Sequence, residues 1–552
     1  MSARNYTVLV PCARLLCPEM QVEFGPVPPG LVPLNGRTVL EHIADGFAGQ
    51  GLLGVRVGLH EGAEVVEEHF ARRPHPALTL DRLAATRSLS DTVLQLLRRL
   101  PDAPGAVLVN LGDTLVRDLP ADAVGLDFAS SAAADETQRW TLFKAERGHI
   151  TELSDKVYRP DPEGWRAFTG LWGFAEPARL RKLLEEEHAA DPAAGYYRAL
   201  RRYVEGSPDY RFIETAQWID CGHADNYYRA RRRLIRPRYF NTLGVGDNPA
   251  SVRKTSSNTR KLIDEVHWYL ALPRELRYFV PAIHDYSTDP LAPMIEMEFY
   301  GYPTLDDCFV YGRFDFDAWD KAFHRLFDVL AAASRYQVRA PDLRADLEEM
   351  YCTKTITRLR EHLAQAGAQS LDPAVADNLA AASIRSVEQL ILALPDLIER
   401  AGLLRAECFQ VIHGDFCFSN ILYDAKHGLV KLIDPRGRFG RYEIHGDVRY
   451  DLAKLSHSVL GHYDLILADQ FRAAPGETRL SPQATRVSDY HATIGSIFRR
   501  HVARAGFDLR AVRLVEALLF LSMPPLHRDH PARQRVMWLR GLELLRQHLE
   551  AV

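Results

Sequence analysis

The stretch Val411-Ile-His-Gly-Asp-Phe-Cys-Phe-Ser-Asn-Ile-Leu-Tyr423, followed by Val430-Lys-Leu-Ile-Asp-Pro-Arg-Gly437, decides the expected fold of the second half of the chain. A short apolar strand leads into the first acidic residue, Asp415. Strand-like runs then end the first stretch and begin the second, and the short turn between them predicts a β-hairpin. The hairpin would bring Asp415, Asn420 and Asp434 to the same end of a small sheet.

These three side chains supply the groups that phosphoryl transfer requires. A carboxylate at Asp415 can orient a hydroxyl, whereas the amide oxygen of Asn420 and the carboxylate of Asp434 are hard oxygen ligands suited to Mg²⁺. Phosphoryl transfer depends on such positioning and on the neutralisation of phosphate charge. The alternative is structural, because aspartate and asparagine are also favoured in turns.

The order His-x-Asp, four residues, Asn, and then Ile-Asp resembles the catalytic and metal-binding loops of the aminoglycoside phosphotransferase and choline kinase family, which has a protein-kinase-like fold. The resemblance implies that Asp415 is the catalytic base and that Asn420 and Asp434 are metal ligands. It also implies ATP as phosphoryl donor and Mg²⁺ as cofactor. Asp447 and Asp451 lie in a phrase that, in this family, braces the catalytic loop.

The sequence before this motif contains the parts expected to hold ATP. The run Ala250–Thr255 is strand-like and carries Lys254, and a helical pattern over Thr259–Leu272 carries Glu265. In a kinase N-lobe a strand lysine contacts the α- and β-phosphates and is fixed by a helix glutamate. We therefore predict these ATP-binding roles for Lys254 and Glu265. The two glycines of Phe240–Asn248 are expected in a loop over the phosphates.

A last N-lobe strand and hinge are predicted over Pro293–Gly301, where backbone groups around Glu298 and Tyr300 would contact adenine. From Phe316 onward the pattern is mainly helical, as expected of a kinase C-lobe. The predicted helices are 319–336, 343–365, 374–394 and 395–401.

The first third of the chain alternates strand-like and helical runs, which predicts a doubly wound α/β sheet. Asp113 follows the apolar run that begins at Ala106, and Asp220 follows a second short strand. Ligands of open α/β sheets lie beyond the carboxyl ends of the strands. Both acids are therefore candidates for one site at that edge.

Residues 5–235 resemble the sugar-phosphate nucleotidyltransferases. In that family two aspartates hold a Mg²⁺ that bridges the nucleotide and sugar phosphates, and Asp113 and Asp220 occupy the corresponding places. The matching segments are the opening strand, Leu31-Val-Pro-Leu-Asn-Gly-Arg37, Leu111-Gly-Asp-Thr114, Gly170-Leu-Trp-Gly-Phe174 and Trp218-Ile-Asp-Cys-Gly222.

The chain departs from that family where the nucleotide phosphates would bind. The family's first loop is rich in glycine, because backbone amides must approach the phosphates closely. Here the loop reads Cys12-Ala-Arg-Leu-Leu-Cys-Pro18, and Pro29 stands where the family has a lysine. Arg14 is the remaining candidate cation. The departures leave open that this domain is catalytically silent or uses an unusual donor.

Composition limits the function classes. The chain has 552 residues with 68 basic and 72 acidic side chains, so its overall balance does not suggest nucleic-acid binding. Seven cysteines without regular spacing favour reduced thiols in a cytoplasm. No apolar run is long enough for a membrane span, and the N-terminus lacks a signal-peptide pattern. Oligomeric state is not predictable.

Together these patterns predict an α/β nucleotidyltransferase-like (Rossmann-like) domain at 1–236 and an α+β two-lobed kinase-like domain, with its N-lobe at 237–303 and its helical C-lobe at 304–552. The expected activity is ATP-dependent phosphorylation of a sugar, polyol or amino alcohol, followed by activation of the product with CTP or another NTP, as in surface-polysaccharide precursor synthesis. The alternatives are an antibiotic phosphotransferase, a kinase with a silent nucleotide-sensing domain, and a scaffold with both sites decayed.

Overall fold

The computed structural model describes residues 5–49, 51–101, 105–133, 136–191, 195–233, 241–245, 250–472, 474, 476–481 and 488–551. The chain divides into two compact units: unit 1 is Met1–Leu234 with Tyr311–Arg313, and unit 2 is Ile235–Val310 with Phe314–Val552. The predicted boundary at 236–237, and residues 240 and 246–248 of the predicted phosphate loop, lie outside the described residues.

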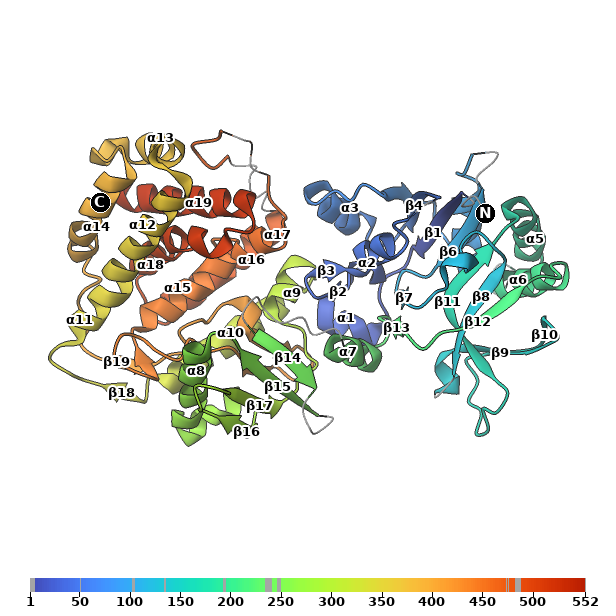
Figure 1. The fold of residues 1–552 in the computed structure, drawn as a ribbon, viewed down its shortest axis with the longest axis horizontal. Coiled ribbons are helices and arrows are strands. Elements are labelled where there is room, and N and C mark those ends of the chain that lie inside the picture. Colours follow the sequence, from blue (N-terminus) through green and yellow to red (C-terminus); the bar gives the residue numbers. More distant parts are fainter. Residues whose placement is uncertain are drawn as a thin grey trace. The chain divides into compact units, whose positions relative to one another are not determined.

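Unit 1 is built on a mixed sheet whose main path runs β10-β9-β11-β6-β1-β4-β5 (Figure 1). Strand β1 pairs in parallel with β4 and β6, β4 pairs in parallel with β5, and β11 runs antiparallel to β6. The strands are β1 (Tyr6–Cys12), β2 (Pro33–Leu34), β3 (Arg37–Thr38), β4 (Leu52–Leu59), β5 (Leu78–Arg82), β6 (Ala106–Asn110), β7 (Thr114–Val116), β8 (Phe128–Ala133), β9 (Thr141–Glu146), β10 (His149–Asp155), β11 (Arg166–Phe174), β12 (Arg211–Glu214) and β13 (Trp218–Asp220).

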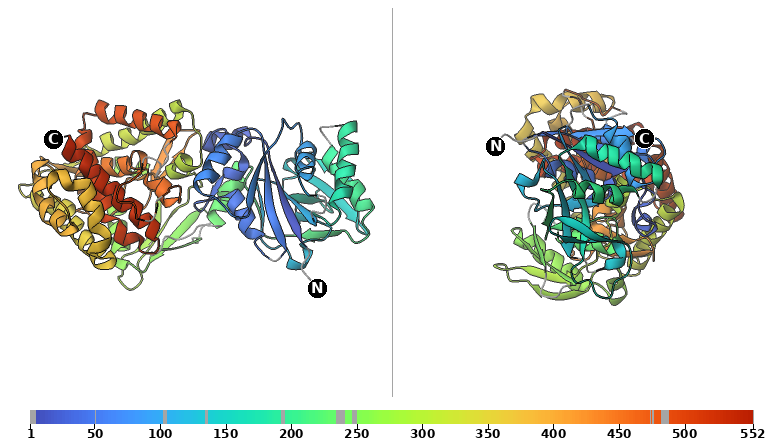
Figure 2. Two further views of the ribbon diagram at one scale, coloured as in Figure 1. Left: turned by 90° about the horizontal axis from the view of Figure 1, so that it is seen from above. Right: turned by 90° about the vertical axis from the view of Figure 1, so that its right-hand side faces the viewer.

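Helices cover both faces of this sheet. Successive residues of a strand point to opposite faces, and accordingly Val8 and Val10 belong to one buried cluster, whereas Leu9 belongs to another. The first cluster includes side chains of α2, α3 and α7, and the second includes side chains of α4, α5 and α6. Accordingly, α2 and α3 lie on the opposite side of the sheet from α5 and α6 (Figures 1 and 2). The prediction of a doubly wound α/β domain is thus confirmed. The helices are α1 (Pro18–Phe24), α2 (Val39–Gly46), α3 (Ala63–Arg72), α4 (Leu89–Leu97), α5 (Pro177–Ala190), α6 (Gly195–Glu205) and α7 (Ala224–Arg233).

Unit 2 begins with an antiparallel sheet in the order β14-β15-β17-β16, against which α8 packs. A helical part follows, and it contains two small sheets: β18-β19-β22 and the hairpin β20-β21. The strands are β14 (Asn241–Val245), β15 (Ser251–Ser256), β16 (Ile283–Ser287), β17 (Met294–Glu298), β18 (Gln337–Val338), β19 (Phe409–Val411), β20 (Ile421–Asp424), β21 (Leu429–Leu432) and β22 (His445–Gly446).

The hairpin predicted from the sequence is present, with Ile421 opposite Leu432 and Gly428 in the turn at φ 64°. The helices of unit 2 are α8 (Thr259–Ala271), α9 (Leu305–Val310), α10 (Phe316–Ala333), α11 (Leu343–Leu347), α12 (Lys354–Ala366), α13 (Ala368–Leu379), α14 (Val387–Arg400), α15 (Val448–Val459), α16 (Tyr463–Leu467), α17 (Asp489–Arg504), α18 (Leu509–Ser522) and α19 (Pro531–Glu550).

Two helix predictions were wrong. The helix expected over 374–394 is divided, because Ser383 adopts a left-handed backbone at φ 61° and Ser386 caps a new helix by accepting a hydrogen bond from the Gln389 amide. The helix expected to start at Pro395 is the second half of α14, which tolerates this proline in its interior. In the described part of the chain no helix is both long and apolar enough to cross a membrane.

Candidate active sites

A buried lysine joins the sheet, the helix and the hairpin of unit 2. Lys254 lies on β15, an inner strand of the sheet, and its Nζ is 2.8 and 2.7 Å from the two carboxylate oxygens of Glu265 on α8. The same Nζ is 2.7 Å from Oδ1 of Asp434, which follows β21. Lys254 is 4% and Glu265 2% exposed. A buried charge needs such partners, so one cation holds two acids from distant parts of the chain.

The loop that carries Asp434 is shaped to reach this lysine. Asp434 adopts a left-handed backbone at φ 57°, and Gly437 follows at φ 81°. A Cβ on Gly437 would lie 2.5 Å from the carbonyl carbon of Asp264 in α8, so only glycine permits this close approach. Burial raises the pKa of Glu265 to about 7, although the ammonium of Lys254 opposes the shift.

Asp415 and Asn420 form a second group beside the hairpin. The Asn420 side-chain amide donates to the backbone carbonyl of Asp415 at 2.9 Å and to its Oδ2 at 3.0 Å. The backbone amide of Ile433 donates to the Asn420 carbonyl at 3.0 Å, which ties Asn420 to the residue before Asp434. On its other oxygen, Asp415 Oδ1 lies 2.8 Å from Nζ of Lys454 on α15.

The backbone that precedes Asp415 is held in place by the carboxylate of Asp451. Both carboxylate oxygens of buried Asp451 accept backbone N–H groups, from His413 at 2.8 Å and Gly414 at 2.7 Å. Burial raises the pKa of Asp451 to about 7 and lowers that of His413 to about 4. Asp447 caps α15 by accepting the Arg449 amide. These contacts are the structural role predicted for Asp447 and Asp451.

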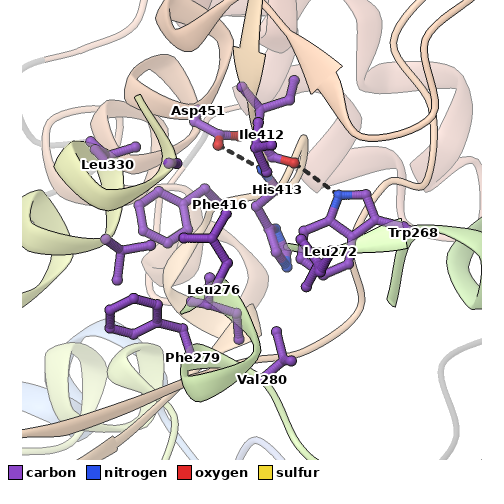
Figure 3. Close-up of a pocket in the computed structure, with 14 residues that line it drawn as sticks. Trp268, Leu272, Leu276, Phe279, Val280, Leu330, Ile412, His413, Phe416 and Asp451 are labelled. Atoms are coloured by element: carbon purple, nitrogen blue, oxygen red, sulfur yellow. Dashed lines mark hydrogen bonds between the residues drawn. The ribbon is translucent and has the colours of Figure 1, made fainter. Parts of the chain in front are cut away.

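Behind this loop lies a small apolar cavity of about 30 Å³, shown in Figure 3. Its wall includes Phe416 and His413 from the loop and Trp268 from α8, whose indole N–H donates to the Ile412 carbonyl at 2.9 Å. A space of this size has room for about two water molecules at most. The cavity therefore belongs to the packing that fixes the loop, rather than to a substrate site.

The predicted hinge residues lie at the end of β17. The Tyr300 hydroxyl donates to Oε2 of Glu298 at 2.7 Å. The backbone amides of Glu298 and Phe299 donate within the sheet, to Ala282 and Ala250. Those two donors are consequently used in the fold, and the predicted contact with adenine would depend on carbonyl groups and on Tyr300.

In unit 1 the two predicted acids meet across a short strand pair. Strand β13 pairs with β7 so that Asp220 stands opposite Thr114, next to Asp113. A Cβ on Gly222 would lie 2.7 Å from Asp113 Oδ2 and 3.4 Å from Asp220 Oδ1, so both carboxylates converge on the space that this glycine leaves open. Burial, together with the charge of Asp220, raises the pKa of Asp113 to about 6.

Asp220 has further polar neighbours. Its Oδ2 is 2.9 Å from His223 Nδ1 and accepts from the Asn226 amide at 3.0 Å. The hydrogen bond to Asp220 raises the pKa of His223. A cavity of about 170 Å³ adjoins Asp220, and Trp140 and Trp218 line it with ring centroids 4.6 Å apart. Arg14, the candidate cation of the glycine-free loop, donates to the Arg87 carbonyl at 2.8 Å.

Both sites offer oxygen atoms of the kind that Mg²⁺ binds. Within the described ranges no group of three or more His, Cys, Asp or Glu side chains could hold a metal ion by itself. Mg²⁺ in nucleotide sites takes only one or two carboxylates and completes its shell with phosphate oxygens and water. Asn420 with Asp434, and Asp113 with Asp220 around the gap at Gly222, fit that pattern.

Sequence reasoning missed the basic and phenolic groups around Asp415. Lys354 Nζ lies 2.8 Å from the Tyr450 hydroxyl, and the Arg436 guanidinium lies 5.8 Å from the Tyr450 ring. The sequence could have indicated only Lys454, because it is three residues after Asp451 in a predicted helical run and therefore lies on the same face of α15. Lys354 is far from these residues in sequence.

No family model matches this chain, and no curated protein matches it significantly. Several solved structures are similar to its N-terminal part. A CTP:phosphocholine cytidylyltransferase from Streptococcus pneumoniae matches at 12% identity over 42% of this chain and 100% of its own, with a TM-score of 0.34. A UDP-glucose pyrophosphorylase complexed with UDP-glucose matches at 14% identity over 42% of this chain and 98% of its own, with a TM-score of 0.33. A UTP-bound UGPase from Acinetobacter baumannii matches at 13% identity over 41% of this chain and 92% of its own, with a TM-score of 0.34. Similarity at this level does not establish the activity or substrate of the chain.

Proposed function

We propose that unit 2 is a kinase that transfers the γ-phosphoryl group of ATP to a hydroxyl of a small molecule. The observation that carries this proposal is the contact of Lys254 with both Glu265 and Asp434, at 2.7–2.8 Å. A lysine fixed by a helix glutamate and directed at a metal-binding aspartate is the arrangement that neutralises ATP phosphates in kinases.

Each remaining residue has a definite role in this proposal. Asp415 orients the acceptor hydroxyl and receives its proton, because its carboxylate is held by Asn420 and by Lys454. Asn420 and Asp434 would hold Mg²⁺, which when bound neutralises and orients the phosphates. The ammonium of Lys454, 2.8 Å from Asp415 Oδ1, fixes the position of this carboxylate beside the acceptor.

For unit 1 the proposed activity is nucleotidyl transfer, with Asp113 and Asp220 holding Mg²⁺ and with CTP or another NTP as the donor. The convergence of both carboxylates at Gly222 supports it. The chain would then phosphorylate a sugar, polyol or amino alcohol and join the product to a nucleotide, with release of pyrophosphate. The glycine-free loop from Cys12 to Pro18 favours a second candidate for this unit, a silent nucleotide sensor.

One experiment separates the two activities. The full chain is incubated with Mg²⁺, ATP, a second NTP and a panel of small alcohols, while ADP and pyrophosphate are measured separately. We expect Asp415→Asn to lower ADP formation by about 10²- to 10⁴-fold, the usual contribution of a general base. Asp113→Asn should abolish only pyrophosphate release, and the exposed Asp317→Asn should change neither.

Acceptor-dependent ADP formation that is unaffected by Asp415→Asn would refute the kinase assignment. If no NTP gives pyrophosphate that depends on Asp113, unit 1 is silent. Because unit 1 would use the product of unit 2, pyrophosphate release is also measured with the phosphorylated alcohols supplied directly, so that each product reports on residues of one unit.

A further inference from the structure

Basic side chains gather on one side of the proposed catalytic base. Lys454 lies 2.8 Å from Asp415, and it is only 8% exposed. Lys354 donates to the Tyr450 hydroxyl at 2.8 Å, and its Nζ lies 5.1 Å from the ring centroid. Arg436 approaches the same ring at 5.8 Å. Two cations, from α12 and from the loop after Asp434, therefore approach a single phenol ring, and the charge of Lys454 on α15 also acts on this phenol.

The charge of this group is only partly balanced by Asp415. Lys354 donates to a hydroxyl, and Arg436 Nε donates to the Arg438 carbonyl at 3.0 Å, so both have neutral partners. The Arg436 stem lies against the loop, since a Cβ on Gly414 would be 2.7 Å from Arg436 Cβ. The side chain of a second basic residue, Arg436, thus packs against Gly414, which directly precedes the base Asp415.

Arg436 also lines an open cavity of about 360 Å³. Its wall carries more basic than acidic side chains: Arg260, Lys261, Arg436 and Arg438 against Asp264 and Glu349. A concave surface with an excess of one charge attracts ligands of the opposite charge. Because Arg436 belongs to both, the cavity and the cation group around Tyr450 form a continuous basic surface next to Asp415.

We propose that the acceptor of the kinase carries an anionic group, a carboxylate or a phosphate, close to the hydroxyl that is phosphorylated. The inference rests on the proposed function of unit 2. Arg436 and Lys354 bind the anionic group, and Asp415 takes the proton of the hydroxyl as its oxygen forms a bond to the γ-phosphorus. The bond from that phosphorus to the β–γ bridging oxygen breaks, and ADP leaves. A polycationic aminoglycoside would meet repulsion from these residues, so the antibiotic phosphotransferase alternative is disfavoured.

The test uses four compounds with the same three-carbon diol skeleton: glycerol, glycerate, glycerol 3-phosphate and 3-amino-1,2-propanediol. Their binding to the full chain is measured by calorimetry with Mg²⁺ and saturating ADP, so that the nucleotide site is filled. We expect at least one anionic compound to bind about tenfold or more tightly than the amine, and glycerol to lie between them. Glycerate and glycerol 3-phosphate distinguish a carboxylate site from a phosphate site.

Variants then assign the site. Arg436→Gln and Lys354→Gln should each weaken the binding of the anionic compound about tenfold or more. Replacement of Arg335, an exposed arginine just after α10, by Gln should leave this binding unchanged. Binding of the amine equal to or tighter than that of both anions, or no binding of either anion, overturns the proposal. The comparison of ligands on the wild-type chain holds even if a variant fails to fold.

A failure of the kinase assignment itself would look different. ADP formation is measured with the same four compounds in wild type and Asp415→Asn. If an anion binds but no Asp415-dependent ADP forms, the anion site stands and the kinase assignment fails. If the amine is the best acceptor, the kinase stands and the charge inference fails.

Discussion

Replacement of Lys254 by methionine should destabilise unit 2 strongly. Lys254 is the shared cation of Glu265, which is 2% exposed, and of Asp434, whose side chain is 27% exposed. Loss of one partner from a buried ion pair costs about 3–5 kcal/mol, because a charge is left without compensation. We expect Lys254→Met to lower the free energy of unfolding by an amount in this range at pH 8.5, mainly because the buried Glu265 carboxylate loses its cation.

The cost should also depend on pH in a defined direction. The pKa of Glu265 is already raised to about 7 with the lysine present, and it must rise further without it. A raised carboxyl pKa means that the folded state holds a proton that the unfolded state has released, so stability falls as pH rises. The difference between wild type and Lys254→Met should therefore be smaller at pH 6, where Glu265 can stay protonated, than at pH 8.5.

Urea unfolding of both proteins at the two pH values measures this difference, with the exposed turn variant Lys426→Met as control. A loss of unfolding free energy below about 1 kcal/mol at pH 8.5 would refute the reasoning, since removal of the lysine leaves the buried Glu265 carboxylate without charge compensation. A difference that does not change with pH would show that Glu265 is not the group left uncompensated.

Three further predictions concern other parts of the chain. Asp113→Asn should stabilise unit 1 by about 1–2 kcal/mol at pH 7.5 in thermal unfolding, because it removes a buried charge and its repulsion from Asp220, which together raise the pKa of Asp113 to about 6. No gain in stability would contradict the convergence of these acids. Binding of the preferred anionic diol should weaken between pH 7 and 9, because Lys354 and Tyr450 both have pKa values lowered to about 8. Whichever of the two releases its proton changes the net charge of the pair from +1 to 0. Calorimetry at constant ionic strength measures the affinity, and binding that does not change with pH would count against this pair as the anion contact. Gly437→Ala should lower ATP affinity at least tenfold in a nucleotide titration, since its Cβ would strike the backbone of α8, and unchanged affinity would show that the loop relaxes without consequence.

Local pattern predicted the hairpin and the two elements that carry the buried ion pair. Lys254 and Glu265 are only 11 residues apart, on a strand and the helix that follows it, so their contact depends on short-range geometry. The hairpin register follows from two apolar runs and a glycine turn. The proposed roles of these residues in binding ATP and metal stay predictions.

The basic surface next to Asp415 could not be predicted in the same way. Lys354 and Tyr450 are 96 residues apart, and their contact depends on how α12 packs in the helical part of unit 2. Charged residues on helices are usually solvated, so their spacing alone did not single them out. In unit 1, the convergence of Asp113 and Asp220 likewise depends on the pairing of β7 with β13, a long-range contact between three-residue strands.

The most direct test of the central claim requires no knowledge of the acceptor. Binding of Mn²⁺·ATP to the full chain is followed by electron paramagnetic resonance in wild type, Asp434→Asn and Asp415→Asn. If Asp434 holds the metal and Asp415 only handles the hydroxyl, Asp434→Asn should weaken Mn²⁺·ATP at least tenfold, whereas Asp415→Asn should leave it within about twofold. Equal binding by wild type and Asp434→Asn would contradict the account.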